Sequence, residues 1–417
     1  MTEWKEYKLK EVVSFIDYRG KTPNKKTFGV PLITAKIVKN GVIQEPTEFI
    51  SFEDYKGWMT RGFPEVGDVV MTTEAPLGEV AQIKDASFAL AQRIITMRGK
   101  VGLLHSGYLK YFLQSNTGQA RLKERETGTT VTGIKSSELK EVLISAPDYT
   151  TQTAIAEILS SLDDKIELNN QINKDLEALA QALFKQWFID FDFPNENGKP
   201  YRSSGGEMVD SELGKIPKGW KIGDFNQIAT LVKKSVKPFD FPENTFFHYS
   251  LPEFDKDKMP GVEQGVNILS SKYKVLNHCI LVSKLNPRIP RIWTIVNCHI
   301  NSICSTEFQV IKPNDLIYFP FINFLCSSTD YLNSIQSKVT GTSSSHQRVN
   351  PSDIINYEMV LPSYSEISMF YNIIYDSLVM VDENRKEIVE LIKLRDTLLP
   401  KLISGELEVS DIQTKTL

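Results

Sequence analysis

Apolar and polar positions alternate with a helical period through the middle of the chain. Within residues 151–192, apolar side chains recur at steps of four and three, and asparagines interrupt them at two places. Such spacing predicts one long helix whose apolar seam packs along a second long helix. At 1.5 Å per residue, roughly 35 residues would form a rod of about 50 Å. The seam positions that we expect to pair are Ile155, Leu159, Leu162, Ile166, Asn169, Leu176, Leu183 and Trp187.

The expected partner helix lies in the same chain. Adding 215 to each seam position gives a second seam within residues 363–405, with the same spacing and mostly apolar side chains. Asn169 and Asn384 fall on one equivalent position. A buried asparagine in a helix seam fixes the register at a cost in stability, whereas an exposed one would do neither; its presence in both repeats favours the register role. The second seam consists of Ile374, Val381, Asn384, Ile388, Leu391 and Leu398.

The stretches that precede the two helices also resemble each other. "GDVVMTTEAPLG" at 67–78 corresponds to "HCILVSKLNPRI" at 278–289, and "TGTTVTGIKSSEL" at 127–139 corresponds to "TGTSSSHQRVNPSDI" at 340–354. Short β-rich runs between glycines and prolines predict a mixed α/β fold for both. Each stretch is also predicted to hold one helix, about 106–125 and about 314–337, with Ser106 and Asn314 as their N-caps. The polar loops that follow offer hydroxyls and N–H groups for phosphate contact, as a plain surface loop would too.

The order of these segments predicts the architecture. Because a short polar linker joins the first helix to the second globular stretch, the second helix should run back antiparallel to the first. We therefore predict two similar α/β domains separated by two long antiparallel α-helices, with approximate two-fold symmetry. The predicted boundaries are 1–150 for the first domain, 151–192 for the first helix, 193–212 for the linker, 213–362 for the second domain, 363–405 for the second helix and 406–417 for a tail.

The composition is that of an ordinary globular protein. The chain has 417 residues, of which 41% are apolar. No apolar run approaches the roughly 20 residues that cross a bilayer, and the N-terminus has no apolar signal region. We expect a cytoplasmic protein with reduced cysteines and no membrane contact. Cys298, His299 and Cys304 lack the spacing of a zinc site, so we expect no metal.

Charge is distributed unevenly along the chain. The net charge is −4, but residues 1–150 and 211–361 each carry +3, whereas residues 151–210 and 362–417 carry −6 and −4. Phosphate would repel the acidic helices, whereas the mildly basic domains tolerate or attract it.

A search for catalytic chemistry finds little. No phosphate-binding loop and no dinucleotide fingerprint are present, and residues 286–289 only partly match an adenine-methyltransferase loop. Pro147-Asp148 followed by Asp163 and Lys165 has the order seen in metal-dependent nucleases. The helical pattern places Asp163 and Lys165 on different faces, so charged positions on a solvated helix face explain them better. We expect no catalytic residues.

Three stretches carry a family resemblance: "GKIPKGW" at 214–220, "LNNQINKDLEALAQALFKQWFIDF" at 168–191 and "LLPKLISGELEV" at 398–409. With the repeat, they resemble the DNA-specificity subunit of type I restriction–modification systems along essentially the whole chain. The resemblance implies that each domain is a target-recognition domain for one half of a split DNA site. It implies that the helices set the spacer and dock methyltransferase subunits. It also implies a non-catalytic chain without a bound cofactor, assembled with restriction–translocase subunits and with a methyltransferase that uses S-adenosylmethionine.

Under this resemblance, basic and polar side chains of both domains should contact double-stranded DNA. Lysines and arginines would mainly neutralise phosphates, whereas Gln92 and Gln347 are suited to reading base edges. For any single lysine, a solvated surface charge is the plain alternative. Two other functions stay open, a solitary metal-dependent DNA endonuclease and a coiled-coil scaffold for protein partners. The candidate DNA contacts are Arg19, Lys21, Lys25, Lys26, Gln92, Arg93, Thr129, Thr130, Lys233, Lys234, Lys237, Arg288, Arg291, Ser343, His346, Gln347 and Arg348.

Overall fold

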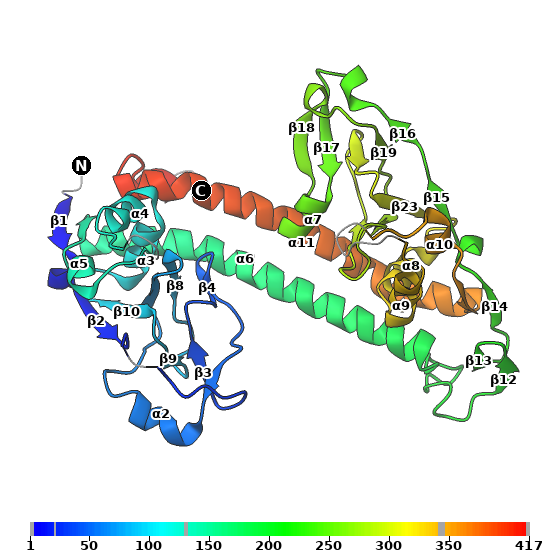
Figure 1. Ribbon diagram of the computed structural model, residues 1–417, viewed down its shortest axis with the longest axis horizontal. Coiled ribbons are helices and arrows are strands. Elements are labelled where there is room, and N and C mark those ends of the chain that lie inside the picture. The colour runs from blue at the N-terminus through cyan, green and yellow to red at the C-terminus, as the bar shows by residue number, and fades with distance from the viewer. Residues whose placement is uncertain (1–3, 21, 129–131, 341–346, 414–417) are drawn as a thin grey trace. The chain divides into compact units, whose positions relative to one another are not determined.

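The chain forms two compact units, each of which combines one globular repeat with a segment of both long helices. Unit 1 comprises residues 1–166 and 390–417, and unit 2 comprises residues 167–389. Neither unit is therefore built from one repeat alone. The computed structural model, drawn in Figure 1, describes residues 4–20, 22–128, 132–340 and 347–413.

The long helices are α6 (Tyr149–Phe184) and α11 (Tyr364–Ser404). α6 begins where the Asp148 carboxylate accepts hydrogen bonds from the amide and the hydroxyl of Thr151, at 3.0 and 2.7 Å. This bond satisfies one of the free N–H groups of the first turn, which explains why the helix starts directly after Pro147-Asp148. Beyond Phe184 the chain continues as a π-helical turn, Lys185–Ile189.

Pro400 and Gly405 both predict an end for the second helix, and the structure places that end at Gly405 rather than at Pro400. Pro400 lies inside α11, and the helix continues to Ser404. The following Leu402 and Ile403 are buried in the core of unit 1, and this burial holds the last turn helical despite the missing proline N–H. The helix ends at Gly405, whose φ of +75° a glycine adopts without strain.

Unit 1 is organised around an antiparallel four-stranded sheet in the order β2-β10-β7-β8. Successive side chains of β7 point to opposite faces, so Val69 and Met71 join one core with α3 while Val70 joins a second core with β3 and β9. Both faces are covered, which explains why all five residues of β7 are buried, including Thr72 and Thr73. The sheet strands are β2 (Val13–Asp17), β10 (Ile94–Gly99), β7 (Val69–Thr73) and β8 (Leu77–Gln82). The other strands and short helices are β1 (Lys5–Lys8), α1 (Leu9–Val12), β3 (Val30–Ile33), β4 (Val38–Lys39), β5 (Val42–Ile43), β6 (Phe49–Ile50), α2 (Phe52–Trp58), β9 (Ala89–Leu90), α5 (Ser136–Lys140), β11 (Leu143–Ala146) and α12 (Val409–Gln413).

Unit 2 contains the same sheet in the order β15-β23-β20-β21, again antiparallel throughout. It adds a five-stranded sheet, β16-β19-β22-β17-β18, where unit 1 has only β6-β3-β9. The strands of the shared sheet are β15 (Ala229–Val232), β23 (Phe308–Pro313), β20 (Cys279–Ser283) and β21 (Ile292–Ile295). The remaining elements are β12 (Met208–Ser211), β13 (Gly214–Pro217), β14 (Lys221–Asp224), β16 (Ser235–Val236), β17 (Thr245–Tyr249), α7 (Leu251–Lys256), β18 (Gly261–Gln264), β19 (Lys272–Lys274), β22 (Ser302–Cys304), α10 (Pro351–Ile355) and β24 (Glu358–Leu361), with 3-10 turns at 225–227, 238–240 and 265–267.

The single helix predicted after each sheet is in fact a pair. In unit 1 the pair is α3 (Ser106–Gln114) and α4 (Asn116–Lys123), and in unit 2 it is α8 (Tyr318–Cys326) and α9 (Thr329–Ser337). The break has the same cause in both: Ser115 and Ser328 accept a hydrogen bond from the amide three residues later and start a new helix. Neither Ser106 nor Asn314 caps a helix as expected.

The core of each unit is completed by both long helices. In unit 1, Leu159 of α6 and Leu402 of α11 are fully buried with the residues of α3 and the sheet. In unit 2, Phe184 of α6 lies within 5.6 Å of Phe321 and within 6.2 Å of Phe370 of α11, measured between ring centroids. The predicted fold class, two similar α/β domains combined with two long helices, is confirmed.

Candidate nucleic-acid interface

In unit 1 a loop closes against the end of the four-stranded sheet. Thr127 and Gly133 exchange two backbone hydrogen bonds of 2.7 and 3.0 Å, which brings these two residues together. The amide of Ile134 then bonds to the carbonyl of Thr73 at the end of β7, at 3.0 Å. The amide of Thr73 bonds in turn to the carbonyl of Arg93, at 3.0 Å. The loop, the end of β7 and the residue before β10 therefore meet at one place.

A cavity of about 440 Å³ opens at this meeting point. Three candidate DNA contacts, Arg19, Gln92 and Arg93, line it together with Lys135. Gln92 is held by the Thr22 hydroxyl, which donates to Gln92 Oε1 at 3.0 Å. The cavity is thus surrounded by two guanidinium groups, an amine and an amide. Their N–H groups can donate hydrogen bonds to phosphate oxygens and to the acceptor atoms on a guanine edge.

Carboxylates orient both arginines of this cavity. Arg19 donates from Nε and Nη2 to the two carboxylate oxygens of Asp17, at 2.9 and 2.6 Å. Burial alone would raise the pKa of Asp17, but the hydrogen bonds and charge of Arg19 lower it below its ordinary value. Arg93 Nε lies 2.9 Å from Glu74. The mixed charge around the cavity favours directed hydrogen bonding over general attraction of phosphates.

The other first-domain candidates lie elsewhere. Lys25 pairs with Glu48 at 2.7 Å and lowers the pKa of that carboxyl, with help from Lys36. Lys26 is exposed, and its backbone bridges that of Phe49. Neither Lys25 nor Lys26 lines the cavity. The candidates that lie outside the described residues are Lys21, Thr129, Thr130, Ser343 and His346.

Unit 2 repeats the backbone arrangement at the end of its sheet. Thr340 and Arg348 exchange two backbone hydrogen bonds of 2.9 and 3.0 Å. The amide of Val349 bonds to the carbonyl of Lys284, just after β20, at 3.0 Å. The amide of Lys284 bonds to the carbonyl of Glu307 at 2.9 Å. Each of these bonds corresponds to one in unit 1, so both repeats close a loop against the same point of the same sheet.

The side chains on this shared frame differ between the units. Glu307 stands where unit 1 has Arg93, and it pairs with Arg348 through both carboxylate oxygens, at 3.0 and 3.2 Å. Arg348 itself replaces Gly133. Next to it, Gln347 has a buried Oε1 atom without a hydrogen-bond partner among the described residues. The same backbone frame therefore presents different donors and acceptors in the two units.

A second group of candidates follows β15. Lys233, Lys234 and Lys237, which we call the lysine tract, flank β16 and are exposed. Within the described part of the chain the structure pairs none of the three with a carboxylate, so their charge is available to phosphate. Arg288 is also exposed. Arg291, by contrast, is held by both oxygens of Asp255, each at 2.7 Å.

In unit 1 a group of charges joins α6 to α11 and to α3. The Asp163 carboxylate accepts hydrogen bonds from Lys110 at 2.6 Å, from the Tyr111 hydroxyl at 2.8 Å and from Arg395 at 2.9 Å. We call these four residues the Asp163 cluster. The Asp163 side chain is only 17% exposed, so the expected solvated helix face is wrong, because α3 covers it. Burial alone would raise the pKa of Asp163, but Lys110, Arg395 and Tyr111 lower it.

In unit 2, α6 and α11 are joined by three polar contacts. The Asn169 amide donates to Glu387 at 2.7 Å, and the Asn384 amide donates to Asn173 at 2.9 Å. Asn169 precedes Asn173 on α6, whereas its partner Glu387 follows Asn384 on α11. The two helix segments therefore run antiparallel in this unit. Glu177 accepts a hydrogen bond from Arg385 at 2.5 Å.

The predicted seam residues of both helices are buried or half-buried. The buried ones are Ile155, Leu159, Asn169, Trp187, Ile374 and Val381. The half-buried ones are Leu162, Ile166, Leu176, Leu183, Asn384, Ile388, Leu391 and Leu398.

Known proteins resemble this chain along its whole length. The sequence model of the type I restriction modification DNA specificity domain matches residues 1–178. The type I restriction enzyme MjaIX specificity subunit of Methanocaldococcus jannaschii is 30% identical over 445 aligned positions, which cover 98% of this chain and 95% of that protein. This chain belongs to the family of type I restriction enzyme specificity subunits. The HindI specificity subunit of Haemophilus influenzae is 24% identical over 98% of this chain and 100% of its own length.

A solved specificity subunit has the same fold. The crystal structure of the type I restriction–modification S subunit from M. genitalium matches 96% of each chain with a TM-score of 0.64, at 15% identity. The family predicted from the helix sequences and the repeat is confirmed.

Two residues at the cavity of this specificity subunit were missed from the sequence. Lys135 lines the cavity at the end of the loop that begins at Thr127. The sequence does contain a signal for Lys135, because this lysine follows the polar loop that is predicted to contact phosphate. The prediction named the hydroxyl residues of that loop and omitted the lysine. Glu74 was missed because acidic residues were not considered as DNA contacts, and its role as the partner of Arg93 follows only from the strand pairing.

The two carboxylates with nuclease-like order are engaged separately. Asp148 caps α6, and Asp163 is bound by three donors. Across the ranges that the structure describes, no three His, Cys, Asp or Glu side chains gather as a metal site would need. No helix in those ranges is both long enough and apolar enough to cross a membrane. Cys279, Cys298, Cys304 and Cys326 are all free thiols.

Proposed function

We propose that this chain selects the DNA sequence on which a type I restriction–modification assembly acts, each globular domain reading one half of a two-part site. The observation that carries the proposal is the 30% identity to a named specificity subunit over 98% of the chain. Two loops closed against equivalent sheet ends support it. A common frame with different side chains suits two readers of different half-sites. The chain itself would be non-catalytic.

Within the first domain, we assign base reading to the cavity residues. Gln92 and Arg93 precede β10, and Arg19 and Lys135 border the same cavity. In the second domain we assign it to Gln347 and its neighbours on the equivalent loop. The lysine tract would neutralise phosphates, because its three charges are exposed and, among the described residues, not oriented by carboxylates.

The long helices would set the distance between the half-sites and dock the other subunits. α6 has 36 residues, which corresponds to about 54 Å of helix and to about 16 base pairs of DNA. Methyltransferase subunits would bind the helices and bring S-adenosylmethionine, and restriction–translocase subunits would complete the assembly. We place its work on DNA in the cytoplasm.

Methylation mapping tests this function directly. The chain is expressed with a type I methyltransferase subunit in a host without other DNA methylation, and the methylated bases are mapped by long-read sequencing. We expect one motif made of two short half-sites separated by an unread spacer. A variant with Gln92→Ala and Arg93→Ala should relax one half-site only, while the control Lys56→Ala, an exposed lysine of α2, should leave the motif unchanged.

Two outcomes would refute the proposal. Cleavage of DNA by the purified chain with Mg²⁺ alone would favour a solitary nuclease. A methyltransferase complex that forms but shows no sequence-selective DNA binding would favour a scaffold for protein partners.

A further inference from the structure

Each unit is completed by a helix from the other half of the chain. We divide the chain at the exposed residues Ser204 and Gly205 into an N-terminal half and a C-terminal half. The core of unit 1 contains Leu402 and Ile403 from the C-terminal half. The core of unit 2 contains Phe184 from the N-terminal half. The two halves therefore need a helix partner, and because they are repeats, a second copy of the same half is a potential competitor.

The repeat gives every position of α6 an equivalent on α11. α6 starts at Tyr149 and α11 at Tyr364, a difference of 215, and the strands before them, β11 and β24, differ by the same number. If a half paired with its own copy in this geometry, each residue would face the equivalent of its native partner. The contacts that such mispairing would remove therefore follow from the repeat.

The contact between Asp163 and Arg395 exists only when the two different halves pair. The position equivalent to Arg395 on α6 is Ala180, so in a pair of N-terminal halves Asp163 would face an alanine and lose one cation. The position equivalent to Asp163 on α11 is Leu378, so in a pair of C-terminal halves Arg395 would face a leucine. Arg395 would keep Asp396 of its own helix but would lose one of its two carboxylate partners.

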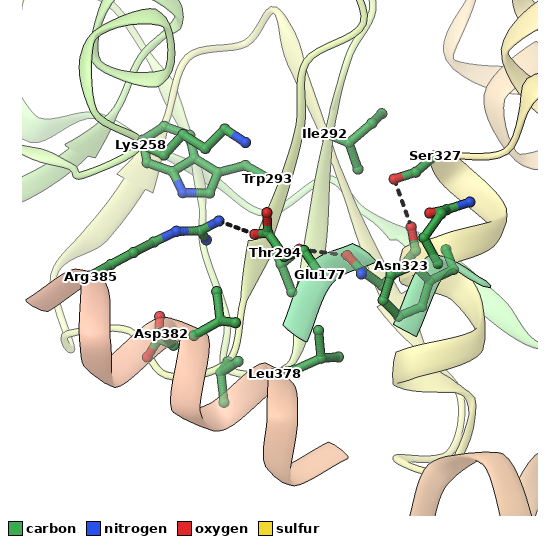
Figure 2. A pocket seen from close by; sticks show the side chains of 14 residues that line it. Glu177, Lys258, Ile292, Trp293, Thr294, Asn323, Ser327, Leu378, Asp382 and Arg385 are labelled. Atoms are coloured by element: carbon green, nitrogen blue, oxygen red, sulfur yellow. Dashed lines mark hydrogen bonds and ion pairs between the residues drawn. The ribbon is translucent and has the colours of Figure 1, made fainter. Parts of the chain in front are cut away.

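The contact between Glu177 and Arg385 follows the same rule. Figure 2 marks the contact between these two side chains with a dashed line. In a pair of N-terminal halves Glu177 would face Asn170, and in a pair of C-terminal halves Arg385 would face Ile392. The contact of Asn173 with Asn384 discriminates against one kind of homodimer. Asn173 would face Asn169 in a pair of N-terminal halves, but Asn384 would face Ile388 in a pair of C-terminal halves.

Unit 2 also shows what stands in place of the Asp163 cluster. The helix-starting serines Ser115 and Ser328 align Lys110 with Asn323, which lines a cavity of about 180 Å³ with Leu378. Asp382 lines the same cavity but is paired with Lys386 at 2.6 Å. Unit 2 therefore has no charge at the three positions equivalent to Asp163, Lys110 and Arg395, where Leu378, Asn323 and Ala180 stand.

We propose that α6 and α11 are charge-matched so that the N-terminal half binds the C-terminal half in preference to a second copy of itself. α6 supplies the carboxylates Asp163 and Glu177, and α11 supplies the guanidinium groups Arg395 and Arg385. The preferred partner of each half is the other half of this chain. Together with the proposed function, this pairing keeps two different readers in one subunit and so specifies an asymmetric DNA site.

The test uses the full chain with a protease site inserted between Ser204 and Gly205, cleaved after purification. The cleaved protein is loosened in dilute urea, returned to buffer and weighed by native mass spectrometry, which separates mixed pairs from both kinds of homodimer. Random association would leave half of the complexes as homodimers. We expect mixed pairs to dominate. Homodimers at the random share in the unmodified protein would overturn the proposal.

Charge variants distinguish charge matching from general helix affinity. Arg385→Glu places two carboxylates together in the mixed pair and should lower the ratio of mixed pairs to homodimers about fivefold, the upper range for a partly exposed ion pair. Adding Glu177→Arg should restore the ratio. The control Lys386→Glu makes the same charge change on the next residue, whose partner Asp382 lies on its own helix, and should leave the ratio unchanged. A double variant that fails to recover would also overturn the proposal. No DNA is present, so the result is independent of the function proposed above.

Discussion

Neutralising Asp163 tests how the first globular repeat is held to the long helices. Asp163→Asn keeps the shape of the side chain but leaves Lys110, whose side chain is 7% exposed, without its counter-ion. Removing one partner of a buried ion pair costs about 3–5 kcal/mol. Arg395 keeps a second partner in Asp396 at 2.8 Å, so we expect the lower end, about 3 kcal/mol.

Calorimetry of the full chain measures this loss. For a unit of this size, 1 kcal/mol corresponds to about 2–4 °C, so the melting temperature of unit 1 should fall by about 6–12 °C. Hydrogen exchange at the amides of α3 identifies which transition belongs to unit 1. Asp164→Asn is the matched control. The Asp164 carboxylate is next to Asp163 in sequence, but it is 61% exposed and pairs with Lys84 on the surface. A fall below about 2 °C for Asp163→Asn would show that the cluster does not stabilise unit 1.

The same variant should alter the acid limb of the stability curve. The folded-state pKa of Asp163 is lower than its unfolded value, so its contribution is fully present above pH about 4 and is lost as the pH falls through the lowered folded-state value. The difference in melting temperature between the unmodified protein and Asp163→Asn should therefore shrink below pH about 4. A difference that grows toward acid pH would have the wrong sign.

Removing all three charges together should be less harmful than removing one. Lys110→Met, Asp163→Leu and Arg395→Met in one chain leave no buried ion unpaired, and such replacements are often neutral or stabilising. We expect this triple variant to lie within about 2 kcal/mol of the unmodified protein. If it is as unstable as Asp163→Asn, an unpaired Lys110 is not the cause of the loss.

The remaining predictions concern DNA and packing. Changing the lysine tract to alanine should reduce the slope of log Kd against log salt by about 2–3, measured by fluorescence anisotropy; an unchanged slope removes the tract from the interface. A seven-residue insertion in α6 after Asn173, matched by one in α11 before Asn384, should lengthen the methylation spacer by about 3 base pairs without changing the half-sites. Leu402→Ala should destabilise unit 1 by about 2–5 kcal/mol in calorimetry although it lies in the other repeat, and an effect on unit 2 instead would contradict the shared core.

The long helices and the repeat could be predicted because both depend on the spacing of apolar residues along the sequence. Steps of four and three define a seam without any knowledge of the partner, and the repeat aligns the second seam with the first. The break at Ser115 could not be predicted this way, because the cap depends on one side-chain hydrogen bond, from the Gly118 amide to the Ser115 hydroxyl. The passage of α11 through Pro400 depends on burial of Leu402, which only the fold reveals.

The candidate site was predicted in part for the same reason. Arg19 and Gln92 were chosen for their chemistry, and the sheet brings them to one cavity although they lie far apart in sequence. Lys25 was chosen on the same grounds, but Glu48 engages it at another place. Which basic residues are neutralised depends on strand pairing, and a sequence pattern does not contain that information.

Under the proposed function, the two units would read different half-sites on one backbone frame. Backbone hydrogen bonds fix the loop to the end of the sheet in both units, and they do not depend on the side chains that the loop carries. Side chains on that frame are then free to change sign, as Arg93 with Glu74 in unit 1 and Glu307 with Arg348 in unit 2 show. In each case the ion pair orients a guanidinium that would otherwise be mobile, so the entropic cost of placing it against a base is lowered before DNA arrives. Exchange of these side chains between the units should therefore move donors without moving the frame, which is the property that a family of readers with different target sequences requires.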